Sequence, residues 1–338
     1  MKEHLESLLA GERLSEDALH LIFREMFAGK YSASEIAAFL VLQQKLGETY
    51  LELFAGAQAM RNAANKVVIS DRVRPLTDNC GTGGDSSNSF NISTASAIVA
   101  SAYGLKVAKH GNRSVSSKCG SADLLFACGL PDTLSPEQTG KLLEKTGFTF
   151  FFAPHFHPVM KHVMPVRKAL RVRTIFNLLG PLANPIAPEY QVIGVGSKRY
   201  LEPMALALQK LGVQRALIVH SRDGLDEISP ADLTDGVWIS GPTVKDIVIN
   251  PKELGYTASL DALKGGDAAF NKGLLEEMLA GAKPEIANCV ALNAGAALWI
   301  GGIAEDHATG SRMAQESIAS GQAKSYFSEF LSAAKALA

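Results

Sequence analysis

The stretch NISTASAIVASAYGLKVAKHG, residues 91–111, places an apolar helical pattern directly before a short β-rich run. Apolar residues recur at helical spacing from Ile92 to Tyr103, and the β-rich run follows after one glycine. Beyond about residue 72 the same alternation continues along the chain. The β-rich runs are Leu105–Ala108, Phe148–Phe152, Gln191–Val195, Ala216–Val219 and Val237–Ser240. Alternation of this kind predicts an α/β fold with a mostly parallel central sheet.

The first sixty or so residues contain no such β-rich runs and are predicted to be helical. Ser15 precedes two acidic residues, as at the start of a helix. Ser32 with Glu35 and Thr49 with Glu52 each fit a capping box. Short helices joined by tight turns therefore predict a small N-terminal helical domain.

The predicted division is a helical domain over residues 1–70 and a large α/β domain over residues 71–338. In the larger part, Pro136–Lys145 and Tyr200–Leu211 have the pattern of helices between strands. Ile286–Ala304 is uncharged and approaches the roughly 20 residues that a membrane span needs. Its asparagines, glycines and alanines favour a tightly packed, buried helix instead.

The composition is that of an ordinary globular protein. Of 338 residues, 47% are hydrophobic and 20% are charged, which argues against a disordered chain. The net charge of −1 argues against electrostatic binding to nucleic acid. Met1–Glu16 has no apolar stretch of the kind found in a signal peptide, and the four cysteines form no CxxC pair. We therefore expect a cytoplasmic protein with reduced thiols and no membrane partner.

The first loop of chemical interest is Gly81–Asp85, called the glycine loop below. It lacks the Gly-Lys-Ser/Thr ending of a Walker A loop, and Ser86 replaces the last glycine of a dinucleotide fingerprint. Its glycines would let backbone N–H groups approach a ligand, and Asn91–Thr94 opens a helix whose N-terminus favours an anion. Considered alone, a tight turn before an ordinary Ser/Thr-capped helix explains the loop equally well.

Two further loops follow predicted strands. The lysine loop, Lys109–Ser117, combines cations, hydroxyls, an amide and a glycine without a nucleophile–base pair, which favours a polyanion site. Two such loops at one sheet edge suit a ligand with two separated phosphates. The acidic loop, Asp223–Glu227, has the adjacent carboxylates that a magnesium ion uses, although by itself an acidic helix start is the simpler interpretation.

Together these loops resemble those of the anthranilate phosphoribosyltransferases. Further matches are His157-Pro158, Val166-Arg167, Arg173–Pro185 and Asp223–Ser229, and the similarity covers nearly the whole chain. The resemblance implies a small helical domain hinged to a large α/β domain, with helices from about residues 157–185 joining the former. It also implies a homodimer formed through the helical parts.

The resemblance implies transfer of the phosphoribosyl group of phosphoribosyl pyrophosphate (PRPP) to the amine of anthranilate in tryptophan biosynthesis, with release of pyrophosphate. The residues implied to bind PRPP are Gly81, Gly84, Asp85, Ser89, Asn91, Ile92, Ser93, Thr94, Lys109, His110, Gly111, Asn112, Arg113, Ser114, Val115, Ser116, Ser117 and Ser121. Two Mg²⁺ ions are implied, one held by Ser93 and the other by Asp226 and Glu227. Gly81, Asn112 and Arg167 would contact anthranilate, and His110 and His157 would line its path.

This chemistry needs positioned substrates and a neutralised leaving group more than a strong base, because an aromatic amine is already nucleophilic at neutral pH. We therefore rank the metal and Lys109 above any general base and expect no covalent nucleophile. Without the resemblance, Arg167 would be one cation of a solvated helix face that also includes Lys161, Lys168, Arg171 and Arg173. His155, His157 and His162 lack the accompanying ligands of a metal cluster.

Two other functions remain as alternatives. A pyrimidine nucleoside phosphorylase shares the fold and phosphate loops but has little use for Asp226 and Glu227. A non-catalytic relative that binds nucleic acid would keep the fold and lose the loops. The sequence also departs from the family at Phe126, Ser221 and Asn288-Cys289, none of which is an implied ligand contact.

Overall fold

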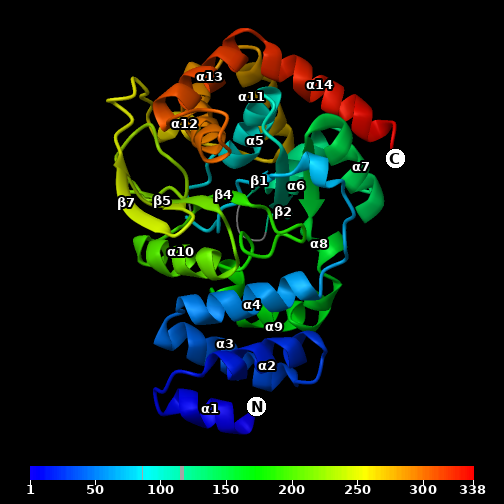
Figure 1. The fold of residues 1–338 in the computed structure, drawn as a ribbon, viewed down its shortest axis with the longest axis vertical. Helices are drawn as coiled ribbons and strands as arrows, with labels where there is room; N and C mark the ends of the chain where they lie inside the picture. Colours follow the sequence, from blue (N-terminus) through cyan, green and yellow to red (C-terminus); the bar gives the residue numbers. More distant parts are fainter. Residues whose placement is uncertain (86, 115–117) are drawn as a thin grey trace.

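The helical residues at the N-terminus form a layered bundle below an α/β part. The computed structural model describes residues 1–85, 87–114 and 118–338. In Figure 1 the first helices, in blue, lie at one end of the molecule, the sheet crosses its middle, and the C-terminal helices cover the other end. The predicted fold class, a small helical domain with a large α/β domain, is confirmed.

The N-terminal bundle begins with four helices whose starts follow the predicted capping signals. Ser15 accepts a hydrogen bond from the backbone N–H of Ala18, and capping boxes form at Ser32 and Thr49. Such caps satisfy backbone donors that have no partner within the helix. The helices are α1 (Lys2–Leu9), α2 (Glu16–Phe27), α3 (Ala33–Leu46) and α4 (Tyr50–Asn62).

Residues far along the chain complete the core of this bundle. The ring of Phe176 lies 6.1 Å from that of Phe27, edge to face. A Cβ added at Gly56 of α4 would lie 2.9 Å from a methyl carbon of Leu179. The segment that contains α9 (Met164–Leu170) therefore packs against the first helices, as Figure 1 also shows.

The central sheet has seven strands in the order β3-β2-β1-β4-β5-β6-β7. The pairs from β3 to β5 are parallel, and β6 and β7 are added as an antiparallel hairpin. The strands are β1 (Thr77–Asp78), β2 (Val107–Gly111), β3 (Phe148–Phe152), β4 (Tyr190–Gly194), β5 (Arg215–Ser221), β6 (Thr234–Ser240) and β7 (Thr243–Ile249).

The predicted β-rich runs all fall within or beside these strands, but two strands were not predicted. β1 has only two residues and therefore no alternation to read. β7 is an edge strand whose first four residues are exposed, so only its last three residues form an apolar run. Both are specified by their neighbours in the sheet rather than by their own pattern.

Helices cover both faces of the sheet. Helix α10 lies between the sheet and α4, while α5, α12, α13 and α14 pack on the opposite side (Figure 1). The remaining helices are α5 (Ile92–Ala102), α6 (Ser121–Ala127), α7 (Pro136–Thr146), α8 (Ala153–Phe156), α10 (Leu201–Lys210), α11 (Ala268–Leu279), α12 (Pro284–Ile300), α13 (His307–Ala319) and α14 (Gln322–Lys335). Short 3-10 turns span Asp71–Val73, Pro158–His162, Ile175–Asn177, Lys198–Tyr200 and Asp261–Leu263.

Helix α12 accounts for the uncharged run near residue 290. It is buried between α5 and α13, as the sequence predicts for a tightly packed helix. A Cβ added at Gly295 would lie 2.4 Å from the backbone N of Ser311, so only glycine permits this approach of two helices. Among the described residues, no helix is both long and apolar enough to cross a membrane.

Candidate active site

The predicted loops meet at one edge of the sheet. β1 lies between β2 and β4, and the chain runs in the same direction in all three strands and in β5. The carboxyl ends of these strands therefore bring the glycine, lysine and acidic loops together. One boundary differs from the prediction. β2 extends through Lys109, His110 and Gly111, which pair with β3 up to Phe152, instead of ending at Ala108.

Backbone N–H groups of the glycine loop bind the acidic loop and the end of β4. The N–H of Gly83 donates to Oδ2 of Asp226 at 2.7 Å, and the N–H of Thr82 donates to the carbonyl of Gly194 at 2.8 Å. Gly83 and Gly84 both have positive φ angles, 65° and 78°. These conformations require glycine and leave no side chain between the loop and a ligand.

Arg173 fixes the same loop from the helical side. Its guanidinium donates to the carbonyl of Gly84 at 2.7 Å and to that of Gly83 at 3.2 Å. The interpretation of Arg173 as a cation of a solvated helix face is wrong, because α9 ends before it and its charge faces the loop backbone. The positive φ of 78° favours glycine at position 84, and a Cβ there would also displace the guanidinium, which would lie 2.7 Å away.

The start of α5 differs from an ordinary capped helix. Asn91 occupies the cap position but makes no capping bond; its amide donates to the carbonyl of Cys119 at 3.1 Å, and its oxygen accepts from Asn271 at 2.8 Å. The N–H of Ile92 donates to the carbonyl of Phe90 at 2.7 Å, but no side-chain cap covers the following N–H groups of α5, which carry the positive end of the helix dipole. Ser89, just upstream, pairs in an isolated bridge with Lys264.

Lys109 joins β2 to the start of α5. Its side chain is 1% exposed, and its ammonium donates to the backbone and side-chain oxygens of Asn79 at 3.2 and 3.1 Å. The amide of Asn79 in turn donates to the carbonyl of Ser93 at 2.7 Å. The hydrogen bonds of this ammonium go to two neutral acceptors, and its position beside Asp78 and Glu227 places it at the sheet edge where an anionic ligand would bind.

The carboxylates of Asp226 and Glu227 lie in a strongly perturbed environment. Burial, and then the neighbouring Asp85, raises the pKa of Asp226 to about 7. Burial, and then Asp226, raises the pKa of Glu227, while Lys109 acts in the opposite direction. One oxygen of Asp85, Oδ2, is buried without a hydrogen-bond partner among the described residues. Crowded carboxylates with an unpaired oxygen fit a hard divalent cation, which would offset their repulsion.

The turn that carries these carboxylates is anchored on α12. The N–H of Ile228 donates to the side-chain oxygen of Asn293 at 2.9 Å, and the amide of Asn293 donates back to the carbonyl of Ile228 at 2.8 Å. The hydroxyl of Ser229 donates to Asp223. These hydrogen bonds restrict the loop, so the carboxylates of Asp226 and Glu227 are held in defined positions.

The end of β1 is joined to the lysine loop and to the matched run Arg173–Pro185. Asp78 accepts hydrogen bonds from the N–H of His110 at 3.2 Å and from the amide of Asn184 at 2.9 Å. Burial raises the pKa of Asp78 to about 6. The amide of Asn184 also donates to the carbonyl of Ala108 at 2.7 Å, so one side chain fixes β1 against β2 beside Lys109.

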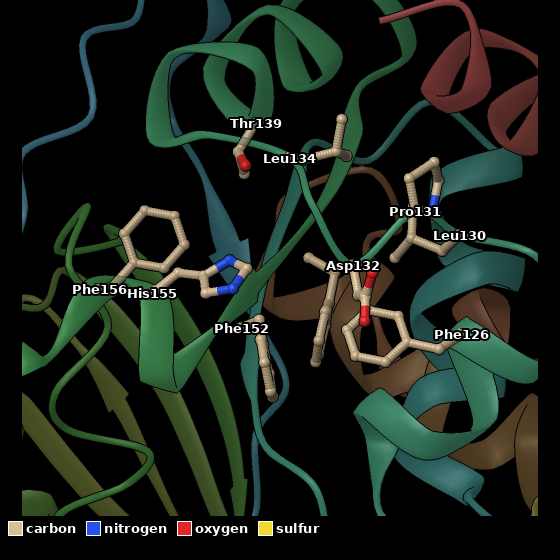
Figure 2. Close-up of a pocket in the computed structure, with 10 residues that line it drawn as sticks. Phe126, Leu130, Pro131, Asp132, Leu134, Thr139, Phe152, His155 and Phe156 are labelled. Carbon is tan, nitrogen blue, oxygen red and sulfur yellow. The ribbon is translucent and has the colours of Figure 1, made fainter. Parts of the chain in front are cut away.

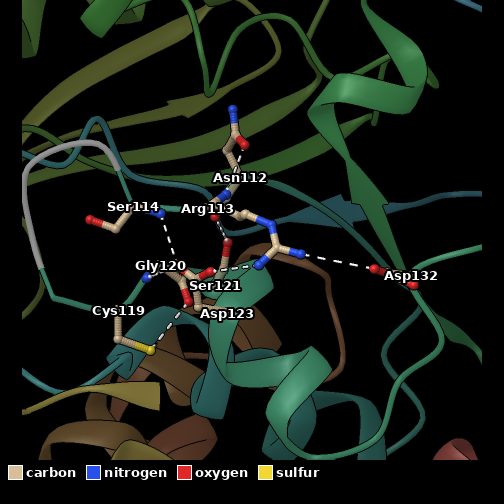
Figure 3. A network of polar contacts seen from close by, with 8 residues as sticks. All are labelled: Asn112, Arg113, Ser114, Cys119, Gly120, Ser121, Asp123 and Asp132. Atoms are coloured by element: carbon tan, nitrogen blue, oxygen red, sulfur yellow. Dashed lines mark hydrogen bonds and ion pairs between the residues drawn. The ribbon is translucent and has the colours of Figure 1, made fainter.

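The lysine loop continues into α6. The hydroxyl of Ser121 donates to the carbonyl of Asn112 at 3.3 Å, and Asp123 accepts backbone hydrogen bonds on both sides of the loop (Figure 3). Val115, Ser116 and Ser117, which the resemblance assigns to PRPP, lie outside the described residues. Asp123 was not predicted as a functional residue, although an acid three residues after a helix cap is a recognisable signal.

Arg167 lies on α9, half-buried over the ring of Phe176. Its guanidinium carbon is 5.6 Å from the ring centre, and burial lowers the pKa of the side chain. Within the described part of the chain it forms no ion pair and makes no hydrogen bond to Gly81 or Asn112. The half-buried position does not fit a solvated helix face, and the guanidinium retains donors for a carboxylate.

His110 and His157 form a buried pair with ring centres 5.1 Å apart. Nδ1 of His110 donates to the carbonyl of Gly180 at 3.0 Å. Burial, and then the other histidine, lowers the pKa of His110 to about 3, and burial lowers that of His157 to about 4. Both rings are therefore neutral at pH 7. Among the described residues, no three or more histidine, cysteine, aspartate or glutamate side chains converge on one point where they could hold a metal ion, so a cation at Asp226 and Glu227 would need ligands from substrate or water as well.

Comparison with known proteins agrees with this arrangement. Models of a glycosyl transferase family match the chain, the helical bundle domain over residues 2–64 and the a/b domain over residues 73–324. A relative from Idiomarina loihiensis, an anthranilate phosphoribosyltransferase, is 43% identical over 320 residues, or 94% of each chain. The chain belongs to the anthranilate phosphoribosyltransferases.

Solved anthranilate phosphoribosyltransferases share the whole fold. The crystal structure of the enzyme from Thermus thermophilus has a TM-score of 0.92 and 41% identity, covering 98% of this chain and 99% of that one. The enzyme from Saccharomyces cerevisiae, solved in complex with PRPP and Mg, has a TM-score of 0.87 and 28% identity, covering 99% and 97%. The fold class and family expected from the loops are thus both confirmed.

Proposed function

We propose that this chain transfers the phosphoribosyl group of PRPP to the amine of anthranilate, giving N-(5-phosphoribosyl)anthranilate and pyrophosphate in a Mg²⁺-dependent reaction. The observation that carries the proposal is the meeting of the glycine loop, Lys109 and the buried pair Asp226 and Glu227 at one sheet edge. Membership of the family supplies the identity of the substrates. The glycine loop, Lys109 and the two carboxylates together offer groups that could bind both phosphate-bearing ends of a doubly phosphorylated sugar.

PRPP is proposed to bind between the glycine loop, the start of α5 and the lysine loop. Backbone N–H groups at α5 and the ammonium of Lys109 offer donors and positive charge to its phosphates. The residues proposed to contact it are those of the sequence-based prediction: Gly81, Gly84, Asp85, Ser89, Asn91–Thr94, Lys109–Ser117 and Ser121.

Two Mg²⁺ ions are proposed, one near Ser93 and one at Asp226 and Glu227. Bound there, the ions would neutralise charge that develops on the departing pyrophosphate. A unit charge pair 4 Å apart is worth about 4 kcal/mol at an effective dielectric of 20, more than the roughly 0.5–1.5 kcal/mol of one neutral hydrogen bond. The ammonium of Lys109 lies close enough to Glu227 to act on the same carboxylates.

Anthranilate is proposed to lie near Gly81 and Asn112 with its carboxylate on Arg167. The C1′–N bond forms as the C1′–O bond to pyrophosphate breaks, and the amine then loses a proton to solvent. A covalent intermediate on cysteine is not needed. The one cysteine next to the glycine loop, Cys80, is a poor nucleophile, because burial, and then Asp78, raises its pKa to about 12.

The proposal includes the quaternary state and the domain division. Residues 1–70, with helices from about 157–185, would form the hinged helical domain, and residues 71–338 the α/β domain. A homodimer would form through the helical domain in the cytoplasm. The apolar core of the first helices includes residues near Phe176, which supports placing that segment with the helical domain; the same core continues onto one face of β4, β5 and β6.

The test is an assay of anthranilate fluorescence. With PRPP and Mg²⁺ the fluorescence should fall as product forms, and a chelator should stop the fall until Mg²⁺ is restored. Fluorescence that stays constant with both substrates, or a rate that the chelator leaves unchanged, would contradict the proposal. Phosphorolysis of thymidine or uridine by the same preparation would favour the nucleoside phosphorylase alternative.

A further inference from the structure

The carboxylate of Asp123 joins the backbone on both sides of the lysine loop. Its Oδ2 accepts hydrogen bonds from the N–H groups of Ser114, at 3.0 Å, and Gly120, at 2.9 Å. Its Oδ1 accepts from the guanidinium of Arg113 at 3.2 Å. Figure 3 shows these contacts meeting at the first turn of α6. One side chain thus connects the segment that leaves β2 to the segment that enters α6.

The two segments are in direct contact. A Cβ added at Gly120 would lie 2.4 Å from the backbone N of Ser114 and 2.7 Å from the carbonyl carbon of Arg113. Real Cβ atoms do not approach other atoms this closely, so position 120 requires glycine. The close approach at Gly120 and the hydrogen bonds to Asp123 are two separate observations that place these backbone segments side by side.

Aromatic rings hold the third donor, Arg113, in place. Its guanidinium carbon lies 5.1 Å from the centre of the Phe126 ring and 5.9 Å from that of Phe152, and Asp132 is 3.9 Å away. Figure 2 shows Phe126, Phe152 and Asp132 around the adjoining hollow. Phe126, a departure from the family pattern, thus forms a cation–π contact that orients Arg113. The guanidinium of Arg113 is half-exposed, so water weakens its ion pair with Asp123. The two backbone hydrogen bonds to Asp123 therefore contribute more to holding the two segments together.

Two of the residues joined by these contacts, Asn112 and Ser121, are proposed ligands of PRPP. The carbonyl of Asn112 accepts from the N–H of Ala122 at 3.2 Å and from the hydroxyl of Ser121 at 3.3 Å, so the start of α6 and the lysine loop form one unit. Asp123 itself is unsuited to touch a phosphate, since its negative charge would repel it. Its oxygens instead organise donors that belong to the neighbouring backbone.

On these grounds we propose that Asp123 is a positioning residue, which holds Asn112–Ser114 and Ser121 in the arrangement that binds PRPP. The inference rests on the proposed function, because it takes PRPP as the ligand of that loop. Asp123 acts through Ser114, Gly120 and Arg113 and does not contact the reacting atoms.

The test compares the full-length wild-type chain with Asp123→Asn, which keeps the size of the side chain but replaces one acceptor oxygen with a donor. We expect KM for PRPP to rise at least tenfold, with kcat and KM for anthranilate within threefold of wild type. The shift in melting temperature caused by PRPP alone should shrink in parallel. Asp132→Asn, which changes the more exposed acid beside the same arginine, is the matched control and should leave all constants within twofold.

A second variant guards against a folding defect in the first. Gly120→Ala separates the same backbone segments while leaving the carboxylate intact, and should raise KM for PRPP to a similar extent. Either variant folded, with KM for PRPP within twofold of wild type, overturns the role of Asp123. A wild-type chain without transfer activity would instead overturn the proposed function itself, so the two failures are distinguishable.

Discussion

Single residues of the site owe their behaviour to burial as much as to chemical type. Arg167 and the nearby exposed Lys168 both lie on α9, yet only Arg167 packs on an aromatic ring. A partly desolvated guanidinium binds a carboxylate more strongly than a solvated one, because water competes less for its donors. The structure therefore separates one cation of this helix from its neighbours, which sequence spacing could not do.

Replacing Arg167 by alanine should weaken anthranilate binding selectively. Loss of hydrogen bonds to a charged group, worth about 1.5–3 kcal/mol, corresponds to a rise in KM for anthranilate of roughly 10- to 100-fold. KM for PRPP should change less than threefold. Steady-state kinetics with each substrate varied in turn measures this, and Lys168→Ala is the control. Equal effects of Arg167→Ala on both substrates would remove its assigned role.

At the scale of elements, loops are positioned by partners from distant parts of the chain. The glycine loop is bound by Asp226 from one side and by Arg173 from the other. Without Arg173 the carbonyls of Gly83 and Gly84 lose the guanidinium donors, and the loop gains freedom that PRPP binding must then remove.

We expect Arg173→Ala to raise KM for PRPP about 3- to 10-fold while the melting temperature of the ligand-free protein changes little. Arg173→Lys should restore only part of the affinity, because one ammonium does not match the two-pronged guanidinium geometry. Lys161→Ala, which removes an exposed cation of the same region, is the control. A wild-type KM for PRPP in Arg173→Ala would show that the loop keeps its shape unaided.

Neutralising the acidic loop should impair magnesium-dependent activity without lowering the stability of the metal-free protein. The double substitution Asp226→Asn and Glu227→Gln should raise the Mg²⁺ concentration needed for half-maximal turnover at least tenfold. Both carboxylates have a pKa raised by burial, so their folded-state penalty grows as pH rises above their usual range near 4 and is largest once both are ionised. The metal-free variant should therefore melt no lower than wild type at pH 8.

Titration of activity with Mg²⁺ and melting curves in chelator test both halves of this prediction. Asp246→Asn, on the exposed edge strand β7, serves as the control for loss of a carboxylate. An unchanged Mg²⁺ requirement would reject the metal assignment, and a large fall in melting temperature would show that the pair stabilises the metal-free fold.

Local signals predicted most elements, whereas contacts between elements were out of reach. Ser32 and Thr49 cap helices through neighbours three residues away, and such short-range chemistry is visible in the sequence. Likewise, parallel strands brought the three loops to one edge as expected. Arg173 and Asn184 act on residues about 90 and 106 positions distant, and no periodicity or spacing encodes such partners. Arg113 shows the same limit, since its partner ring at Phe126 was noted only as a departure from the family.

Across the whole molecule, a helical bundle and an α/β part share a boundary that contains the buried His110 and His157 pair. His110 belongs to β2, and its ring donates to Gly180 in the segment that packs with the first helices. Because both rings are buried and neutral, protonating either one opposes the folded state. Stability of this boundary should therefore depend on pH.

The sign follows from the two lowered pKa values, about 3 for His110 and about 4 for His157, against about 6.5 for an exposed histidine. The two neutral histidines make their full contribution to the free energy of unfolding above pH 6.5. This contribution is lost as pH falls, because the histidines of the unfolded chain take up protons first. Each histidine accounts for about 1.4 kcal/mol per pH unit in that range.

In His157→Gln, the free energy of unfolding should consequently fall less steeply between pH 6 and about pH 4 than in wild type. The difference in slope should equal the contribution of one histidine. Urea unfolding at several pH values measures the slope, and His4→Gln in α1 is the control. Both proteins keep the same carboxylates, so the difference between their slopes isolates the ring. Parallel curves for wild type and His157→Gln would contradict the assignment of a buried, neutral histidine.

The most direct test of the central claim is a crystal structure of this chain with PRPP and Mg²⁺. The account predicts the sugar diphosphate bound between the glycine loop and the lysine loop, with Lys109 on a phosphate and density for metal at Asp226 and Glu227. An ordered protein whose bound PRPP lies away from both loops, or whose acidic pair has no metal while PRPP is present, would contradict it.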